Sequence, residues 1–559
     1  MMKKINLILT LIFGLSLFQS CETTELDLTV SPNQVSVDNL DPDFLFNNIQ
    51  LGFRGFVSSA AGPGSLTSTL SRQFAMTSGN TYENAASPVS FDGLWSSAYA
   101  GILNDIKSLE PIAEERNMTY HLGVSKIFKA YVYMTLVDLF GDVPMTEALM
   151  GNDNLNPGKT SQTEIYTAMM AELDAAIALL GEKPSIFPSQ DLYYVTLDAD
   201  AQAQWIKAAN SIKLKALISA KKAGSDIGVS DVKSAIEGLA SKVISDPADD
   251  FQFQYGVNRQ NPGTRHPGYN RYYESSATGY MSNYFMWSLT TEKGFEDPRT
   301  KYYFYRQDTD ATNEDIFTLG CVEASAPSHY GAVSSIYDST IGMPFCTAVP
   351  EEGYWGRDHG DNGGIPPDDE KRTVFGVYPV GGQYDDGEGE GMQNEGVDGK
   401  KGGGIQPILL DFYIDFMMAE VQLTEGVAGD AKASLESGIR GSMKKVTEFL
   451  DVDGDATAAQ IDTYVDFVLD AYDAASAEQK LNIIMKEFHI ASYGNGLEAY
   501  NGYRRTGKPD NFQPTLVQNS GDFYNSFLYP GDHVNLNSTA TQKERTERVF
   551  WDKAGLTLN

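Results

Sequence analysis

The chain has 559 residues, of which 75 are acidic and 42 are lysine or arginine, so its formal net charge is −33 at pH 7. A surface this acidic repels nucleic-acid phosphates, which argues against DNA or RNA binding and favours a neutral or cationic ligand. The length alone would allow roughly three or four domains.

The first twenty residues have the composition of an export signal. Two lysines precede an apolar stretch, residues 5–18, that is shorter than the roughly 20 residues of a membrane-spanning helix. A small residue comes directly before Cys21, as in a bacterial lipobox, so we expect removal of residues 1–20 and lipidation of Cys21. The alternative is an ordinary cleaved signal followed by an incidental cysteine. Residues 21–38 are polar and predict a tether, and no later segment has the length and hydrophobicity of a membrane span.

Residues 39–245 predict the first part of a helical scaffold. Residues 124–140 are apolar on nearly every face, which indicates a buried central helix, and Ser161 with Glu164 has the spacing of a capping box. Apolar residues recur at helical spacing in the ranges 95–112, 124–140, 161–180, 205–220 and 232–243.

Residues 246–404 form a long insert with little periodicity. The insert is rich in glycine, proline and asparagine, and fifteen of the 55 residues from Phe251 to Tyr305 are aromatic. Disordered segments are poor in aromatic residues, so we expect this insert to be ordered and packed on the scaffold. Residues 381–404, by contrast, are glycine-rich and acidic and predict a flexible surface loop.

Helical periodicity returns from about residue 405 to residue 510. An apolar stripe runs through residues 431–446, and Ser476 with Gln479 predicts a second capping box. Antiparallel helix pairs with short links favour a helical-repeat scaffold, although the sequence has no clean fixed-period repeat and no complete tetratricopeptide signature.

Two cysteines remain besides Cys21. In an oxidising compartment Cys321 and Cys346 are expected to form a disulfide, which would stabilise the fold by roughly 3 kcal/mol. The alternative is a pair of unpaired buried thiols.

Signatures of catalysis are sparse. The sequence contains no P-loop, HExxH or GxSxG motif, although its many acidic residues would supply accidental carboxylate pairs for glycoside hydrolysis. We therefore predict a protein that is not an enzyme.

Structural calcium has two candidate sites in the sequence. Asp451, Asp453, Asp455 and Asp462 have part of a calcium-loop spacing, but an acidic turn that caps the next helix explains them as well. The acidic cluster at residues 385–390 would also suit calcium, and its alternative is a solvated loop.

Residues 354–368 combine aromatic, charged and amide side chains. Trp355 lies close to Arg357 and His359, and such forked donors beside rings suit a polar, ring-shaped ligand. The alternative is a structural loop whose polar side chains bond the backbone.

Several motifs in order resemble the SusD/RagB family of nutrient-binding lipoproteins. They are AYVYMTLVDLFGDVPMTEAL at residues 130–149, WIKAANSIKLKALISA at 205–220, YWGRDHGDNGG at 354–364 and EFHIASYGNGLEAYNGYRRTGKP at 487–509, followed by SFLYPGDHVNLN. They are spread along most of the chain beyond the tether.

The resemblance implies a mainly α fold and a partner. The fold would be a right-handed superhelix of tetratricopeptide-like helix pairs with long irregular loops and minor β structure, as one domain over residues 39–559. The partner would be a SusC-like TonB-dependent barrel in the outer membrane, over which the lipid-anchored protein closes as a lid on the outer face of the cell. No cofactor is implied.

Family members bind oligosaccharides, and some bind peptides. Capture of oligosaccharides is therefore the leading hypothesis for the function. The alternative is the same role for oligopeptides, and a surface hydrolase is a weaker alternative. Aromatic side chains would bury the sugar faces while polar groups bond the hydroxyls. For each aromatic residue, core packing is the competing interpretation. The residues at matching positions are Asn80, Tyr82, Asn84, Trp95, His266, Tyr269, Arg271, Tyr272, Tyr273 and Trp287, to which we add Trp355, Arg357 and His359.

Overall fold

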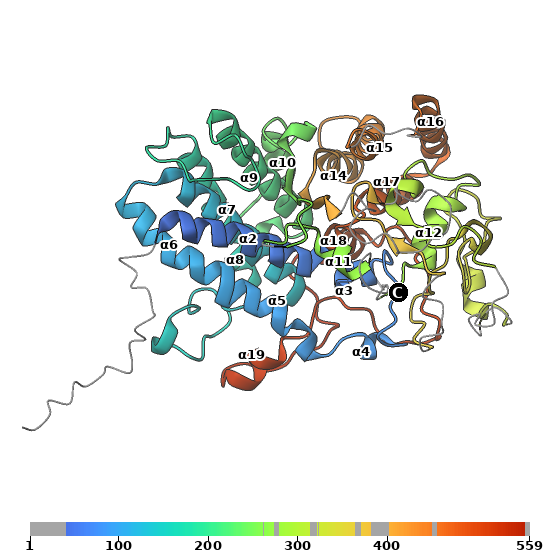
Figure 1. Cartoon of the computed structure of the whole chain (residues 1–559), viewed down its shortest axis with the longest axis horizontal. Helices are drawn as coiled ribbons and strands as arrows, with labels where there is room; N and C mark the ends of the chain where they lie inside the picture. The colour runs from blue at the N-terminus through green and yellow to red at the C-terminus, as the bar shows by residue number, and fades with distance from the viewer. Residues whose placement is uncertain are drawn as a thin grey trace, which may run out of the picture.

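The structure is a computed structural model that describes residues 41–260, 262–272, 279–312, 321, 324–363, 371–381, 402–449 and 456–553. The predicted signal, Cys21 and the tether lie outside the described residues. Helices dominate and strands are few and short (Figure 1), which confirms the predicted mainly α fold. Within the described part of the chain, no helix has both the length and the hydropathy that crossing a membrane requires.

The first half of the scaffold is a set of long helices packed against their neighbours in sequence. Helix α7 packs on α8 and α8 on α9, while α2 lies against α6 and α7. Its elements are α2 (Pro42–Ala61), α3 (Leu66–Leu70), α4 (Tyr82–Ala85), η3 (Pro88–Phe91), α5 (Asp92–Ser96), the π-helix η4 (Ser97–Leu103), α6 (Asn104–Glu115), α7 (Thr119–Phe140), η5 (Gly151–Asp153), α8 (Gln162–Leu180), α9 (Ala199–Ser219), η6 (Gly224–Ile227) and α10 (Val232–Leu239).

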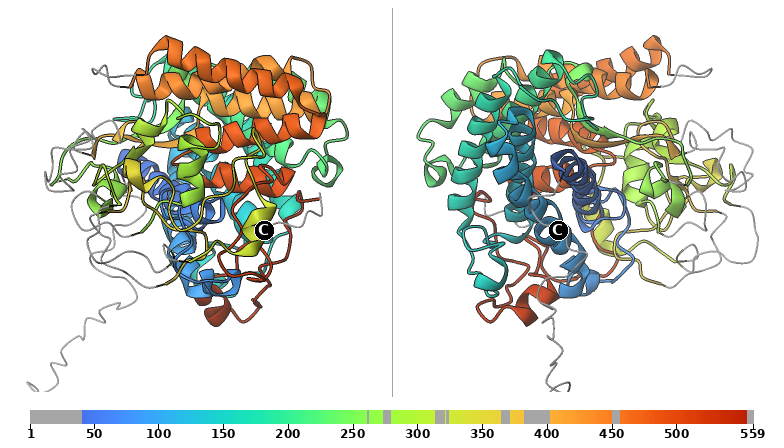
Figure 2. Two further views of the ribbon diagram at one scale, coloured as in Figure 1. Left: turned by 90° about the vertical axis from the view of Figure 1, so that its right-hand side faces the viewer. Right: turned by 60° about the vertical axis from the view of Figure 1, so that its left-hand side comes forward.

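The second half repeats this arrangement with a second group of helices. Helix α14 packs on α15 and α15 on α16, and α17 lies against α14, so the four helices are seen side by side along one edge in Figure 2. The elements are β4 (Ile405–Leu409), α14 (Asp411–Thr424), α15 (Ala431–Thr447), α16 (Ala458–Ala474), α17 (Ala477–Ala491), α18 (Gly496–Thr506) and α19 (Gly531–Leu536).

The insert is ordered over its described residues, and one pair of short strands joins it to the scaffold while a second pair lies within it. Strand β1, at the start of the insert, pairs antiparallel with β4, and β2 pairs antiparallel with β3. The elements are η7 (Pro247–Asp249), β1 (Phe251–Gln254), α11 (Pro267–Tyr272), α12 (Asn283–Thr290), α13 (Thr300–Tyr303), β2 (Phe304–Tyr305), η9 (Ser328–Ala332), η10 (Pro350–Glu352) and β3 (Val374–Phe375). Most of the predicted flexible loop, residues 382–401, lies outside the described residues.

Most sequence-predicted helices are present with small shifts at their ends. The stretch predicted as a buried helix is α7, whose side chains are almost all buried and which ends at Gly141, where φ is +81°. Ser476 and Gln479 form the predicted reciprocal capping box. At α8 only half of the predicted box forms: the Ser161 side chain accepts a hydrogen bond from the Glu164 backbone N–H.

Two sequence predictions about helix ends are wrong. The helix expected to reach residue 243 ends at Leu239, and residues 240–242 form a turn. The acidic turn does not supply the N-cap of α16, because Thr457 does so in a capping box with Gln460.

Candidate functional site

Two of the predicted binding segments meet at one cavity of the described structure. The cavity has a volume of about 530 Å³ and lies between the end of α2, the start of α3, the segment from α4 to α5 and the first residues of α11. We call it the serine cleft. Its lining residues are 58–60, 63–66, 69, 78, 85, 86, 90, 91, 93, 94, 266–268 and 527.

A tight turn after α2 opens one wall of the serine cleft. The turn begins at Gly62, where a Cβ atom would lie 2.5 Å from the carbonyl oxygen of Ser58, so only glycine fits. Gly64 follows with φ of +74°, and Ser65 then caps α3 by accepting a hydrogen bond from the backbone N–H of Ser68 at 3.2 Å. The chain reverses within these few residues and places Ser58, Ser59 and Ser65 on the same wall.

The lining of the serine cleft is uncharged and rich in hydroxyl groups. None of its described residues is Asp, Glu, Lys or Arg, although 21% of the chain is charged. The hydroxyls of Ser59, Thr69 and Ser78 donate to the backbone carbonyl oxygens of Gly55, Ser65 and Ala85 at 2.8–3.0 Å. Their oxygens keep free lone pairs, so this wall mainly offers hydrogen-bond acceptors.

His266 is the titratable residue of the lining. Its side chain is buried, with its ring 4.7 Å from the ring of Tyr255, and Nδ1 accepts a hydrogen bond from the backbone N–H of Gly268 at 2.9 Å. Burial and the nearby Arg54 charge lower the pKa of His266 to about 3, so the ring is neutral near pH 7. The cleft therefore carries no formal charge on its described lining at that pH.

The predicted residues of the first segment lie beside the cleft and do not all face it. Asn80 is half-buried, Asn84 is exposed, and Tyr82 is buried with its hydroxyl accepting from Arg72 Nη2 at 2.8 Å. Trp95 is half-buried, and its ring packs 4.7 Å from that of His533. Tyr82 and Trp95 are thus held by protein contacts in this structure.

In the middle loop, Tyr269 is buried under the guanidinium of Arg265, which lies 4.8 Å from its ring centre. Trp287, in α12, is also buried, with Lys486 5.6 Å from its ring. The side chains of Arg271 and Tyr272, and all of Tyr273, lie outside the described residues. They begin three residues after Gly268, the last residue of this part of the cleft wall.

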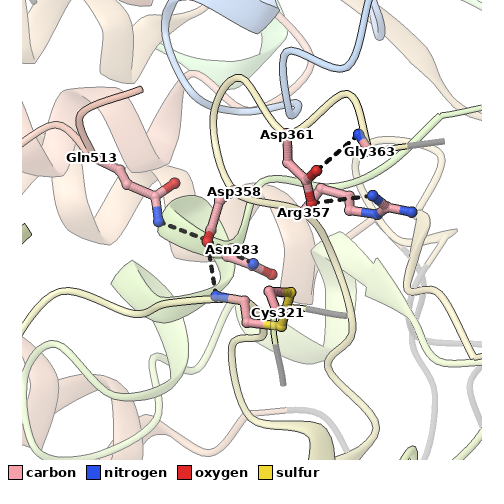
Figure 3. The surroundings of a disulfide bond; sticks show 8 residues. Asn283, Cys321, Arg357, Asp358, Asp361, Gly363 and Gln513 are labelled. Carbon is pink, nitrogen blue, oxygen red and sulfur yellow. Dashed lines mark hydrogen bonds and ion pairs between the residues drawn. A yellow bond between two sulfur atoms is a disulfide. The ribbon is translucent and has the colours of Figure 1, made fainter. Parts of the chain in front are cut away.

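The third predicted group, Trp355, Arg357 and His359, lies around Asp358 in a buried set of polar contacts rather than an open site (Figure 3). We call the hydrogen-bonded surroundings of Asp358 the buried joint. Asp358 accepts hydrogen bonds from the side chains of Asn283 and Gln513, at 2.9 and 2.8 Å, and from the backbone N–H of Cys346 at 2.8 Å. Burial raises the pKa of Asp358 to about 6. The carboxylate therefore ties α12, the disulfide loop and the C-terminal segment together.

The neighbours of Asp358 are buried as well. The guanidinium of Arg357 lies 4.5 Å from the ring centre of Tyr280 and pairs with Asp361 at 3.1 Å. The ring of His359 is fully buried 5.8 Å from that of Tyr82. These contacts match the structural-loop alternative over the described part of the segment, residues 354–363.

Trp355 is buried in a small cluster with the disulfide. Cys321 and Cys346 are bonded, with their Cα atoms 5.6 Å apart, as the sequence predicts. Trp355 and Ala311 pack against Cys346.

The two predicted calcium sites fall mainly outside the described residues. The exception is Asp462, in α16, whose carboxylate pairs with Arg440 at 2.7 Å. Across the described residues, no group of three or more His, Cys, Asp or Glu side chains is arranged to hold a metal ion.

With the geometry in place, the chain can be compared with known proteins. A SusD-like family model described as "Starch-binding associating with outer membrane" matches residues 32–343 and 376–530. The chain belongs to the SusD/RagB family. No curated protein matches it in sequence.

Solved structures of SusD/RagB proteins share this fold across nearly the whole chain. A SusD homologue from Bacteroides fragilis has 17% identity and a TM-score of 0.63, covering 92% of this chain and 99% of the other. A chitin-binding protein has 18% identity and a TM-score of 0.63 over 92% and 100% of the two chains. A chitin-binding SusD homologue from Flavobacterium johnsoniae has 18% identity and a TM-score of 0.56 over 92% and 99%.

Proposed function

We propose that this SusD/RagB protein captures oligosaccharides at the cell surface and delivers them to a SusC-like TonB-dependent transporter in the outer membrane. It would be held there by a lipid on Cys21 and would face the cell exterior. Capture and delivery require affinity and release but no bond cleavage, so we propose no enzymatic activity.

The uncharged, hydroxyl-lined serine cleft is the observation that favours oligosaccharides. Its volume lies within the range of roughly 300–1,000 Å³ that small-molecule sites occupy. Sugar hydroxyls can donate to the free lone pairs of the serine and threonine oxygens, and Phe91, Leu66 and Leu94 supply apolar surface for the C–H faces of the ring. We propose Arg271, Tyr272 and Tyr273, next in the chain after the cleft wall, as further ligand contacts.

The oligopeptide alternative is supported by a second cavity. It measures about 760 Å³ and lies between the insert and the start of α16. Its walls carry both signs of charge, with Glu296 and Glu352 near Lys301 and Arg306, beside the apolar Phe295. Such a mixture suits a zwitterionic ligand better than a neutral sugar.

Calorimetry would separate these ligand classes. A chain starting after Cys21 would be titrated with neutral oligosaccharides from starch and chitin and with a pool of mixed short peptides. We expect heat with an oligosaccharide and none with the peptides, whereas heat with the peptides alone would overturn the oligosaccharide proposal. Shorter products after prolonged incubation would contradict the absence of catalysis.

The transporter partner needs a separate test. The lipidated protein would be extracted from membranes in mild detergent and purified with whatever remains bound to it. We expect a large TonB-dependent barrel to co-purify. Recovery of the protein alone after chemical cross-linking in intact cells would contradict the delivery role.

A further inference from the structure

The hydrogen bonds that the protein makes with His266 fix the role of this side chain in the serine cleft. Because its Nδ1 accepts from the backbone N–H of Gly268, the single proton of the neutral ring must sit on Nε2. Among the described residues, no hydrogen bond reaches Nε2, and this atom is not one of the fully shielded polar atoms without a partner. Nε2–H is thus an accessible donor on a side chain that is otherwise 98% buried.

The surroundings of His266 hold the ring in place. The ring lies edge-on to Tyr255 and roughly parallel to Phe375, whose centre is 6.2 Å away. The backbone N–H of His266 donates to Gly402 O at 2.9 Å, which anchors this wall to the end of the insert. A donor held this firmly loses little side-chain entropy when a ligand binds.

The hydroxyl groups elsewhere in the cleft act as acceptors and so complement the donor on His266. Hydroxyls such as those of Ser59 and Ser78 have already given their protons to backbone carbonyls, so they face the cleft chiefly as acceptors. A neutral sugar carries hydroxyls that donate to such acceptors and ring or hydroxyl oxygens that accept from Nε2–H. A charged sugar would lose hydration without meeting a counter-charge on the described lining.

We propose that the serine cleft selects uncharged oligosaccharides, and that His266 Nε2–H donates a hydrogen bond to an oxygen of the bound sugar. This proposal rests on the proposed function, because it names the class of sugar that the same cleft takes. It assigns His266 a direct contact with the ligand, and it excludes uronic acids and free amino sugars from the cleft.

The selectivity test compares neutral oligosaccharides with charged oligosaccharides of similar length. Neutral oligosaccharides from chitin and starch would be titrated calorimetrically alongside de-N-acetylated chitin fragments, which are cationic, and oligogalacturonate, which is anionic. We expect charged ligands to bind at least about tenfold more weakly, since an unpaired buried charge is costly. Equal or tighter binding of a charged sugar would overturn the selectivity while leaving oligosaccharide capture intact.

Variants of His266 test the donor itself. His266→Phe keeps a ring but removes the donor, so we expect about a tenfold loss of affinity for the neutral sugar. His266→Gln restores an N–H donor and should recover part of that affinity, while thermal unfolding shows that both variants remain folded. Unchanged affinity in His266→Phe, or equal losses in both variants, would overturn the role of Nε2–H. Failure of the wild-type chain to bind any neutral sugar would instead overturn the proposed function.

Discussion

At the scale of single residues, the predicted sugar platforms among the described aromatic side chains are packed within the protein. Tyr82 shows why: its ring lies edge-on to Phe523 at 5.5 Å, and its hydroxyl accepts from Arg72. Aromatic content therefore predicts that the insert is ordered, but it cannot separate a core ring from an exposed platform. Burial decides that, and burial depends on which distant segments pack together.

Tyr82→Phe tests this structural role. Removing the hydroxyl leaves a buried Arg72 donor without that acceptor, so we expect a loss of about 1 kcal/mol in the free energy of unfolding. Sugar affinity should stay at the wild-type value. A large loss of affinity with unchanged urea unfolding would show that Tyr82 contacts the ligand.

Asp358→Asn tests the buried joint beside the disulfide. The carboxylate accepts three hydrogen bonds, whereas the amide would turn its N–H₂ group toward existing donors. We expect a loss of about 3 kcal/mol in the free energy of unfolding, measured by urea denaturation. Asp338→Asn, at an exposed turn, is the matched control and should change it far less. Similar losses in the free energy of unfolding for the two variants would contradict the stabilising role of Asp358 in the buried joint.

At the scale of helices and strands, the sequence predicts a helix best where its apolar residues or its capping residues form a recognisable pattern. The buried α7 and the capped α17 follow from their own residues. Helix α2 was not predicted, although the signal is present: Asp41 is the N-cap, a proline follows, and Phe46, Ile49 and Phe53 recur on one buried face. Strands β1 and β4 pair residues that are more than 150 positions apart, such as Phe251 and Leu409, so their pairing could not be found locally.

Glu420 joins helices from both halves of the scaffold. In α14, its buried carboxylate accepts from Arg505 of α18 at 2.7 and 2.9 Å and from Lys221, after α9, at 2.8 Å. Burial alone would raise the pKa of Glu420, but these two cations hold it at about 2. Since the folded-state pKa lies below the unfolded value, the stability that this charge contributes is complete above about pH 4.5 and is lost as the pH falls toward 2.

We therefore expect Glu420→Gln to lower the free energy of unfolding by about 3–5 kcal/mol at pH 7, because the buried guanidinium of Arg505 loses its carboxylate partner and Lys221 is left with Thr424 and with Glu425, 3.6 Å away. The difference from the wild-type chain should shrink as the pH falls below about 4.5. Urea unfolding across pH 3–7 would measure both effects. Asp462→Asn, which removes an exposed carboxylate paired with Arg440, is the control and should cost at most about 1 kcal/mol. If the difference in unfolding free energy between the wild-type and Glu420→Gln chains stays constant down to pH 3, the Glu420 charge does not contribute this stability.

At the scale of the whole molecule, the family and the mainly α fold could be predicted from ordered motifs, but the serine cleft could not. More than half of its lining residues are Ser, Gly or Ala, which form no motif in the sequence. Folding brings together the end of α2, the segment before α5, the start of α11 and Phe527. His266 was predicted from its position in the middle loop, whereas Ser59, Ser78 and the other hydroxyls of the wall were missed.

The most direct test of the account fills the serine cleft. Gly93 lines the cleft in α5, and a Cβ atom there would meet nothing within 4 Å, so Gly93→Trp can place an indole in the cavity. Gly238→Trp, at an equally open helical position in α10 away from the cleft, is the matched control. By calorimetry with a neutral oligosaccharide, we predict binding by the wild-type and Gly238→Trp chains and at least about a hundredfold weaker binding by Gly93→Trp, all three with similar unfolding temperatures. Unchanged affinity in folded Gly93→Trp would contradict the assignment of the ligand to this cleft.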